Sequence, residues 1–214
     1  MKALILIDLQ NDLMPGGAWP VPRGDEVVAI ANALMPCFKL VVATQDWHPP
    51  NHCIFVTQHP ERAVGERLPH RRFLHVLQPV HCVRNTFGAR LHGSLNLGRV
   101  NKIVQRGTDP EVDGASAFHD QAGEIATGLA PYLREKSVRQ VYLMGLPTET
   151  TVKLTALEAL GLDLRVIVIE DGCRTRHPAS AEAQQVWQEL KEAGVGVQRS
   201  GLILETWKNR AGAW

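Results

Sequence analysis

The sequence predicts an α/β fold with three layers, α/β/α, built on one mainly parallel sheet of about six strands. Short runs rich in Val, Ile and Leu alternate with amphipathic stretches along the chain, which is typical of such folds. Several of these runs are apolar on both faces, as expected for strands that helices cover on each side. With 214 residues, the chain is long enough for one sizeable α/β domain and short for two. We therefore expect one domain over residues 1–214.

Six apolar runs are predicted strands: Ala3–Leu9, Lys39–Gln45, Lys102–Arg106, Gln140–Leu146, Leu164–Glu170 and Val195–Arg199. Four amphipathic stretches are predicted helices: Asp25–Met35, Glu124–Lys136, Glu149–Leu160 and Ser180–Ala193. Gly161 and Gly194 follow the third and fourth of these, where a helix C-cap favours a residue that tolerates positive φ. The region 46–101 breaks the alternation, and a loop of this length in a compact domain is usually functional.

Composition excludes several classes of partner. Lysine and arginine (23) nearly balance aspartate and glutamate (22), so no global field attracts nucleic acid or an anionic membrane. The first apolar run ends at Asp8 and indicates a buried strand rather than a signal peptide, and no stretch is long enough to span a bilayer. The four cysteines show no paired spacing, which is typical of reduced thiols in the cytoplasm. We expect a small-molecule partner and a cytoplasmic location, and the sequence leaves a homo-oligomer open.

A metal site is indicated directly after the second predicted strand. Asp46, His48 and His52 form the pattern Asp-x-His-x-x-x-His at the carboxyl end of that strand, where parallel sheets place their ligands. One carboxylate and two imidazoles suit Zn²⁺ or Fe²⁺ and leave positions for water or another side chain. The spacing alone is equally compatible with loop histidines that make ordinary hydrogen bonds.

Three segments of the chain resemble one family of hydrolases. They are Ile7–Asp12, Gln45–His52 and Gly145–Val152, and the likeness runs from Leu4 to about Gly201. Together they resemble the nicotinamidase/pyrazinamidase branch of the isochorismatase-like hydrolases. The resemblance implies the fold of that family and one divalent transition metal, zinc or iron first and manganese as a further option. It also implies that His81, in His81-Cys82-Val83, is a fourth metal ligand beside Asp46, His48 and His52.

The same resemblance implies a damaged catalytic triad. Family members use an aspartate, a lysine and a cysteine, and the aligned residues here are Asp8, Arg106 and Thr151. Arg106 keeps the positive charge but does not exchange its proton. A cysteine thiol ionises readily beside a cation, whereas a threonine hydroxyl does not. We therefore expect the cysteine-based reaction to be lost.

Further departures fall on the oxyanion and substrate positions of the family. The aligned oxyanion and pocket segment includes Pro147 and Thr148, and the family draws oxyanion N–H groups from the positions of Pro147 and Thr151. Proline has no N–H to donate. Leu13 and Gln78 occupy the positions of two aromatic side chains that hold the substrate ring in the family.

Two functions remain. The first is a metal-binding homologue with little or no nicotinamidase activity, which binds a small molecule or acts in regulation. The second is a divergent metal-dependent hydrolase of an amide or related C–N bond. In that second function metal-bound water or Thr151 replaces the cysteine, and Asp8 accepts the proton.

Overall fold

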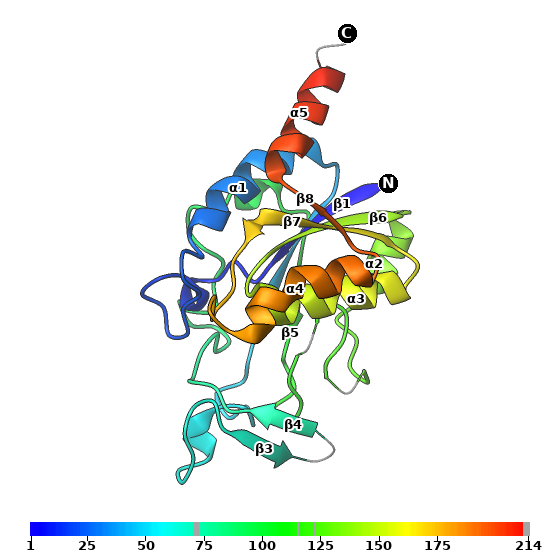
Figure 1. Ribbon diagram of the computed structural model, residues 1–214. Helices are drawn as coiled ribbons and strands as arrows, with labels where there is room; N and C mark the ends of the chain where they lie inside the picture. Colours follow the sequence, from blue (N-terminus) through cyan, green and yellow to red (C-terminus); the bar gives the residue numbers. More distant parts are fainter. Residues whose placement is uncertain (71–72, 115, 122, 212–214) are drawn as a thin grey trace.

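The computed structural model describes residues 1–70, 73–114, 116–121 and 123–211. It contains a six-stranded sheet in the order β5–β2–β1–β6–β7–β8, and every neighbouring pair is parallel (Figure 1). The strands are β1 Lys2–Ile7, β2 Val41–Asp46, β5 Lys102–Arg106, β6 Gln140–Gly145, β7 Arg165–Cys173 and β8 Gly196–Gln198. All six predicted strands are present, so the predicted α/β fold is confirmed.

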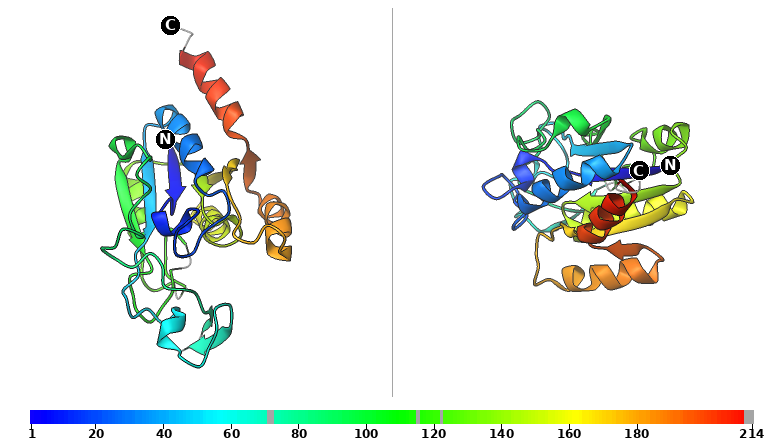
Figure 2. Two further views of the ribbon diagram at one scale, coloured as in Figure 1. Left: turned by 90° about the vertical axis from the view of Figure 1, so that its left-hand side faces the viewer. Right: turned by 90° about the horizontal axis from the view of Figure 1, so that it is seen from above.

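Helices cover both faces of this sheet (Figure 2). The chain leaves β1 through α1 (Glu26–Leu34) in one direction along the sheet, and it leaves β6 through α3 (Lys153–Gly161) in the other. Because parallel crossovers are right-handed, connections that run in opposite directions place their helices on opposite faces. Accordingly α5 (Ser200–Ala211) packs on α1, and α4 (Ala181–Glu192) packs on α3. The helix α2 (Leu129–Glu135) crosses from β5 to β6 and completes the second layer.

The core is centred on β1, which pairs with β2 on one side and β6 on the other. All five residues from Ala3 to Ile7 are completely buried. Burial of a Leu or Ile side chain contributes about 1.5–3 kcal/mol, so this strand anchors the residues that follow it.

Two predicted helix boundaries are wrong. The helix predicted at Glu124–Lys136 begins only at Leu129, because Thr127 pairs with the Phe118 carbonyl and Gly128 then adopts φ +83°. The helix predicted at Glu149–Leu160 opens with a π-helical turn, Thr148–Val152, before α3. Gly194 has the expected positive φ, whereas Gly161 lies inside α3 and Asp163 takes the left-handed conformation instead.

The region 46–101 contains short elements that the sequence did not predict. A hairpin pairs β3 (Arg67–His70) with β4 (Phe73–Val76) below the main sheet (Figure 1). Strands of four residues, one with a proline inside, give too little alternation to be recognised. The helix α5 was also not predicted. In the described part of the chain, no helix has both the length and the apolar character needed to cross a membrane.

Candidate functional site

The carboxyl ends of neighbouring strands bring the predicted site residues to one edge of the sheet. Asp8 directly follows β1, Asp46 and Arg106 end β2 and β5, and Thr151 lies in the helical turn after β6. The connections from β1 and β6 run in opposite directions, so the gap between these strands is the switch point where open α/β sheets bind ligands.

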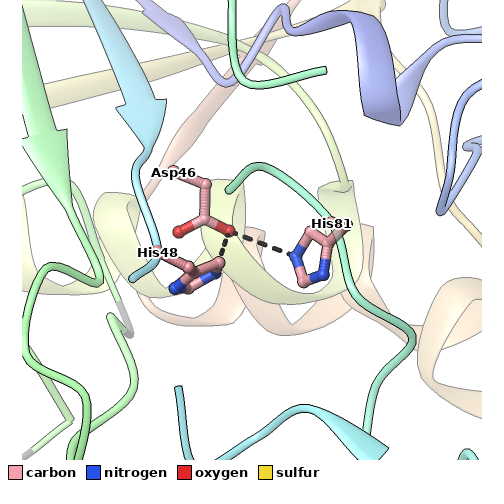
Figure 3. A group of neighbouring side chains, drawn as sticks. All are labelled: Asp46, His48 and His81. Carbon is pink, nitrogen blue, oxygen red and sulfur yellow. Dashed lines mark ion pairs between the residues drawn. The ribbon is translucent and has the colours of Figure 1, made fainter. Parts of the chain in front are cut away.

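Asp46, His48 and His81 form a buried group with the geometry of a metal site (Figure 3). Their ligand atoms all lie within 4.8 Å of one another. The Asp46 Oδ2 atom is 3.0 Å from His48 Nε2 and 3.5 Å from His81 Nε2. A tetrahedral ion with bonds of about 2.0–2.1 Å separates its ligand atoms by roughly 3.3 Å. The observed spacing therefore fits a zinc-like ion.

Hydrogen bonds orient both imidazoles toward Asp46. The Nδ1 atoms lie 3.0 Å from the Gly107 carbonyl in His48 and 2.9 Å from the Pro79 carbonyl in His81. Each Nδ1–H therefore donates to a carbonyl, which leaves the Nε2 lone pair for a metal. His48 Nε2 and Asp46 Oδ1 are buried, and neither has a hydrogen-bond partner of suitable geometry among the residues that the structure describes. A bound cation would satisfy these atoms, so the residues fit a metal.

His52 joins the group through His48 rather than through Asp46. Its ring centroid lies 4.4 Å from that of His48, and its ligand atom clusters with those of His48 and Asp113. Burial, together with the charge of His48, lowers the pKa of His52 to about 3, so its imidazole is neutral. Asp113 follows the Arg106–Gly107 segment without any motif, and sequence reasoning missed it.

Residues of the first motif hold these ligands in place. The Gln10 side-chain amide donates to the Asp46 carbonyl and accepts from the Asp46 N–H, both at 2.7 Å. The Asp12 carboxylate accepts from the Cys82 N–H at 2.7 Å, next to His81. Gly107 has φ +62°, and a Cβ atom there would lie 2.6 Å from the His48 ring. Only glycine fits at position 107 without displacing a ligand.

Arg106 connects Asp8 and Thr151 to the metal group. Its Nη2 atom lies 2.6 Å from Asp8 Oδ2 and 3.2 Å from Asp46 Oδ2, and it donates to Thr151 Oγ1 at 3.3 Å. The Nε atom also donates to Asp8 Oδ2 at 3.1 Å, while Nη1 donates to the Gly114 carbonyl. The guanidinium is thus held from three sides.

Burial and charge set the protonation states in this cluster. Burial raises the pKa of Asp8, although the charge of Arg106 opposes that change. Burial alone would also raise the pKa of Asp46, but Arg106 and His48 hold it well below its usual range. The two carboxylates raise the pKa of Arg106 despite its burial, so the guanidinium stays charged.

A cavity of about 540 Å³ extends from the metal group to Thr151. Predicted site residues among those that line it are Leu13, Asp46, Gln78, His81, Arg106, Pro147 and Thr151. Asp8 and Thr148 are completely buried, and neither is among the described lining residues. The Thr148 N–H donates to the Arg174 carbonyl at 2.9 Å.

Trp19 is an aromatic wall of this cavity that sequence reasoning missed. Its ring centroid lies 4.5 Å from that of His81, and the Arg176 guanidinium carbon lies 3.6 Å from the Trp19 centroid. Leu13 and Gln78 also line the cavity, and neither has an aromatic face. The sequence signal that could have identified Trp19 is its position, as an aromatic residue in the loop that follows the segment Ile7–Asp12.

None of the cavity-lining residues that the structure describes is a cysteine. Burial raises the pKa of Cys53 and of Cys173 to about 12, and it raises the pKa of Cys82 well above its usual range. Burial also raises the pKa of Cys37. A thiolate is the reactive form of cysteine. Thus none of the four thiols is placed to act as a nucleophile beside Thr151 in the described part of the cavity.

Comparison with known proteins places the chain in a family. The sequence profile of the Isochorismatase domain matches residues 2–200. The chain belongs to the isochorismatase family. It is 38% identical over 203 residues to the nicotinamidase of Escherichia coli (strain K12), a match that covers 90% of this chain and 92% of that relative.

Solved structures of nicotinamidases have the same fold. The Acinetobacter baumannii nicotinamidase/pyrazinamidase superimposes with a TM-score of 0.89 and 35% identity, covering 94% of this chain and 96% of that one. PnC1 from L. infantum, in complex with nicotinate, superimposes with a TM-score of 0.81 and 34% identity, covering 94% of this chain and 93% of that one. The Pyrococcus horikoshii pyrazinamidase, in complex with zinc, superimposes with a TM-score of 0.75 and 34% identity, covering 92% of this chain and 98% of that one.

Proposed function

We propose that the protein is a metal-binding nicotinamidase-like member of the isochorismatase family that has lost cysteine-based amide hydrolysis and binds a small molecule in its metal-centred cavity. One observation carries this proposal. Thr151, which the family resemblance aligns with the nucleophile, accepts a hydrogen bond from Arg106, and Arg106 is itself bound to both Asp8 and Asp46.

Among the described residues, the Thr151 hydroxyl has a hydrogen bond only from Arg106 and none to a proton acceptor. The Arg106 guanidinium has only donors and does not take up a proton. Both oxygens of the buried Asp8 carboxylate already accept hydrogen bonds, one from the Thr44 hydroxyl and one from Arg106. A hydroxyl without an adjacent base is a weak nucleophile.

The oxyanion position is also weakened. Pro147 lines the cavity and carries no N–H, so one of the two backbone donors that the family resemblance implies is missing. Loss of one such donor lowers the rate by roughly 10²–10³ in enzymes where it has been measured. Nucleophile, base and oxyanion donor are therefore all affected.

Asp46, His48 and His81 would hold one divalent transition metal, zinc or iron, with His52 beside His48. When bound, the ion would polarise a carbonyl or carboxyl oxygen of the ligand. The zinc in the P. horikoshii relative supports zinc as the first choice. The protein's own contribution is to orient the ligand between the metal group and the wall formed by Pro147 and Thr151.

Metal-dependent hydrolysis of an amide or related C–N bond is the second candidate. It is favoured by the placement of Asp46 and His81, which line the same cavity as Thr151. A substrate carbonyl in that cavity would lie near both the metal group and the altered triad.

The proposal is tested on protein purified without a histidine tag. Elemental analysis should find about one zinc or iron per chain after incubation with Zn²⁺, Fe²⁺ and Mn²⁺. Ammonia release from nicotinamide and pyrazinamide is measured beside the E. coli relative. We expect rates several orders of magnitude below the usual range of about 1–10³ per second. Turnover within that range would refute the loss of function, and amide hydrolysis that stops when the metal is removed would favour the second candidate.

A further inference from the structure

Arg176 is a buried charged residue that the proposed function does not use. It follows β7, lines the cavity and is only 7% exposed. Its Nη1 atom donates to the carbonyls of Trp19 and Pro20, and its guanidinium stacks on the Trp19 ring. The Nε and Nη2 atoms make no hydrogen bond to any described residue, and the described residues provide no ion-pair partner within 4.0 Å.

The carboxylate of Glu149 influences the charge of Arg176 but forms no ion pair with its guanidinium within 4.0 Å among the described residues. Glu149 Oε1 accepts from the backbone N–H groups of Arg176 and His177, at 2.7 and 3.4 Å, rather than from the guanidinium. Burial lowers the pKa of Arg176 to about 10, although the charge of Glu149 opposes this. A buried charge without a paired counter-charge is costly, so an anion bound at this guanidinium would be stabilising.

Arg174, two residues earlier in the chain, provides a comparison, because its guanidinium is paired within the protein. Its guanidinium forms an ion pair with Glu26 at 2.7 Å and donates to the carbonyls of Asp171 and Cys173. Arg174 therefore has its counter-charge within the protein, and it does not line the cavity. Arg176 differs in both respects.

We propose that Arg176 recognises a carboxylate carried by the small molecule that binds in the cavity. The free Nε–Nη2 edge of the guanidinium has the geometry for a bidentate carboxylate contact. Trp19 contacts both His81 and Arg176, so a single aromatic ring lies against the metal group and against the guanidinium. A volume of about 540 Å³ is ample for a small organic molecule.

The ligand class is thus a small organic acid with a second carbonyl or amide group at the metal end. This inference rests on the proposed function, because it takes the cavity as the ligand site. It differs from the neutral ring amide that a nicotinamidase hydrolyses.

Matched probe pairs test the inference by calorimetric titration of metal-loaded protein. One pair is 3-carbamoylbenzoate and benzene-1,3-dicarboxamide, and the other is succinamate and succinamide. Each pair differs only in whether one end is a carboxylate or an amide. We expect the carboxylate to bind at least about tenfold more tightly in one or both pairs, because hydrogen bonds to charged groups are the stronger ones. Arg176→Gln should weaken carboxylate binding by about 10–100-fold and change diamide binding by less than about twofold.

Arg67→Gln is the matched control, because Arg67 also lines the cavity but is exposed. This variant should keep the preference for carboxylates. Arg176→Lys keeps the charge without the planar fork and should fall between wild type and Arg176→Gln. If Arg176→Gln does not fold by thermal unfolding, the lysine variant decides the question.

Three results would overturn the inference. They are equal affinity within both pairs, an undiminished preference in the Arg176 variants, and no binding of either carboxylate below about 10 mM. None of these depends on turnover, so the ammonia assay separately decides whether amide hydrolysis is lost. Conversely, fast nicotinamide turnover would defeat the proposed function and leave the probe comparison valid.

Discussion

Thr151→Cys alone should restore little amidase activity. The new thiol would replace a hydroxyl that lies 3.3 Å from Arg106 Nη2, and a cation at that distance lowers a thiol pKa. The nucleophile would therefore be available. The remaining defects lie at Arg106, which binds Asp8 through two nitrogens, and at Pro147, which offers no N–H.

The size of the remaining defect follows from these contacts. The missing Pro147 donor alone lowers the rate by about 10²–10³. Arg106 touches both Asp8 and Thr151, so its replacement and that of Thr151 should be strongly coupled. We expect the triple variant Thr151→Cys, Arg106→Lys, Pro147→Ala to exceed Thr151→Cys by more than about 10²-fold, a non-additive gain typical of triad members.

Steady-state ammonia release from nicotinamide measures these variants. A quintuple variant adds aromatic residues at Leu13 and Gln78, which should lower KM, because neither of these cavity-lining side chains now offers an aromatic face to the substrate ring. Thr150→Cys is the matched control, since position 150 lines the cavity beside the nucleophile position. The reasoning fails if Thr151→Cys by itself reaches most of the activity of the triple variant.

Three further outcomes are expected. Gly107→Ala should reduce metal content and lower the unfolding midpoint, because the new Cβ atom would collide with the His48 ring. Gly123→Ala is the control: Gly123 has a similar φ, but a Cβ atom there would contact no described atom within 4 Å, so this variant should keep its metal. Gln10→Leu should weaken metal affinity by about 10–100-fold in a chelator competition, and an unchanged affinity would contradict the positioning role. Burial lowers the pKa of His75, so its neutral imidazole contributes stability above pH 6.5, and this stability is lost as the pH falls below that value. His75→Gln should therefore reduce the pH dependence of the free energy of unfolding measured in urea. Equal pH profiles for the variant and the wild type would refute this prediction.

The sheet could be predicted because burial on both faces leaves a strong local signal. The run predicted at Ala3–Leu9 corresponds to β1 at Lys2–Ile7, and the five residues that the two ranges share are completely buried. A continuous apolar run of that length between amphipathic helices is typical of a buried strand in a parallel sheet. The metal group could be predicted for a related reason. Asp46 and His48 lie within one short motif at the end of a strand, so their proximity is local.

The rest of the cavity depends on tertiary contacts that no local pattern encodes. Trp19, Asp113 and Arg176 reach the site from three loops that are distant in sequence, and none of them carries a motif. The start of α2 was misplaced because the pairing of Thr127 with Phe118 overrides the helical pattern of the preceding residues. Tertiary pairing of this kind routinely overrides local propensity.

Arg106 and Thr151 are physically compatible with each other. Arg106 has all three nitrogens engaged, with Asp8, Asp46, Thr151 and the Gly114 carbonyl as partners. A lysine has one nitrogen and would leave part of this set without a donor. A thiolate at 151 would add a third anion beside a guanidinium that already serves two carboxylates, whereas a threonine hydroxyl adds only an acceptor. Changing either position alone therefore leaves an unmatched charge or an unmatched hydrogen bond, which is why the two should be varied together.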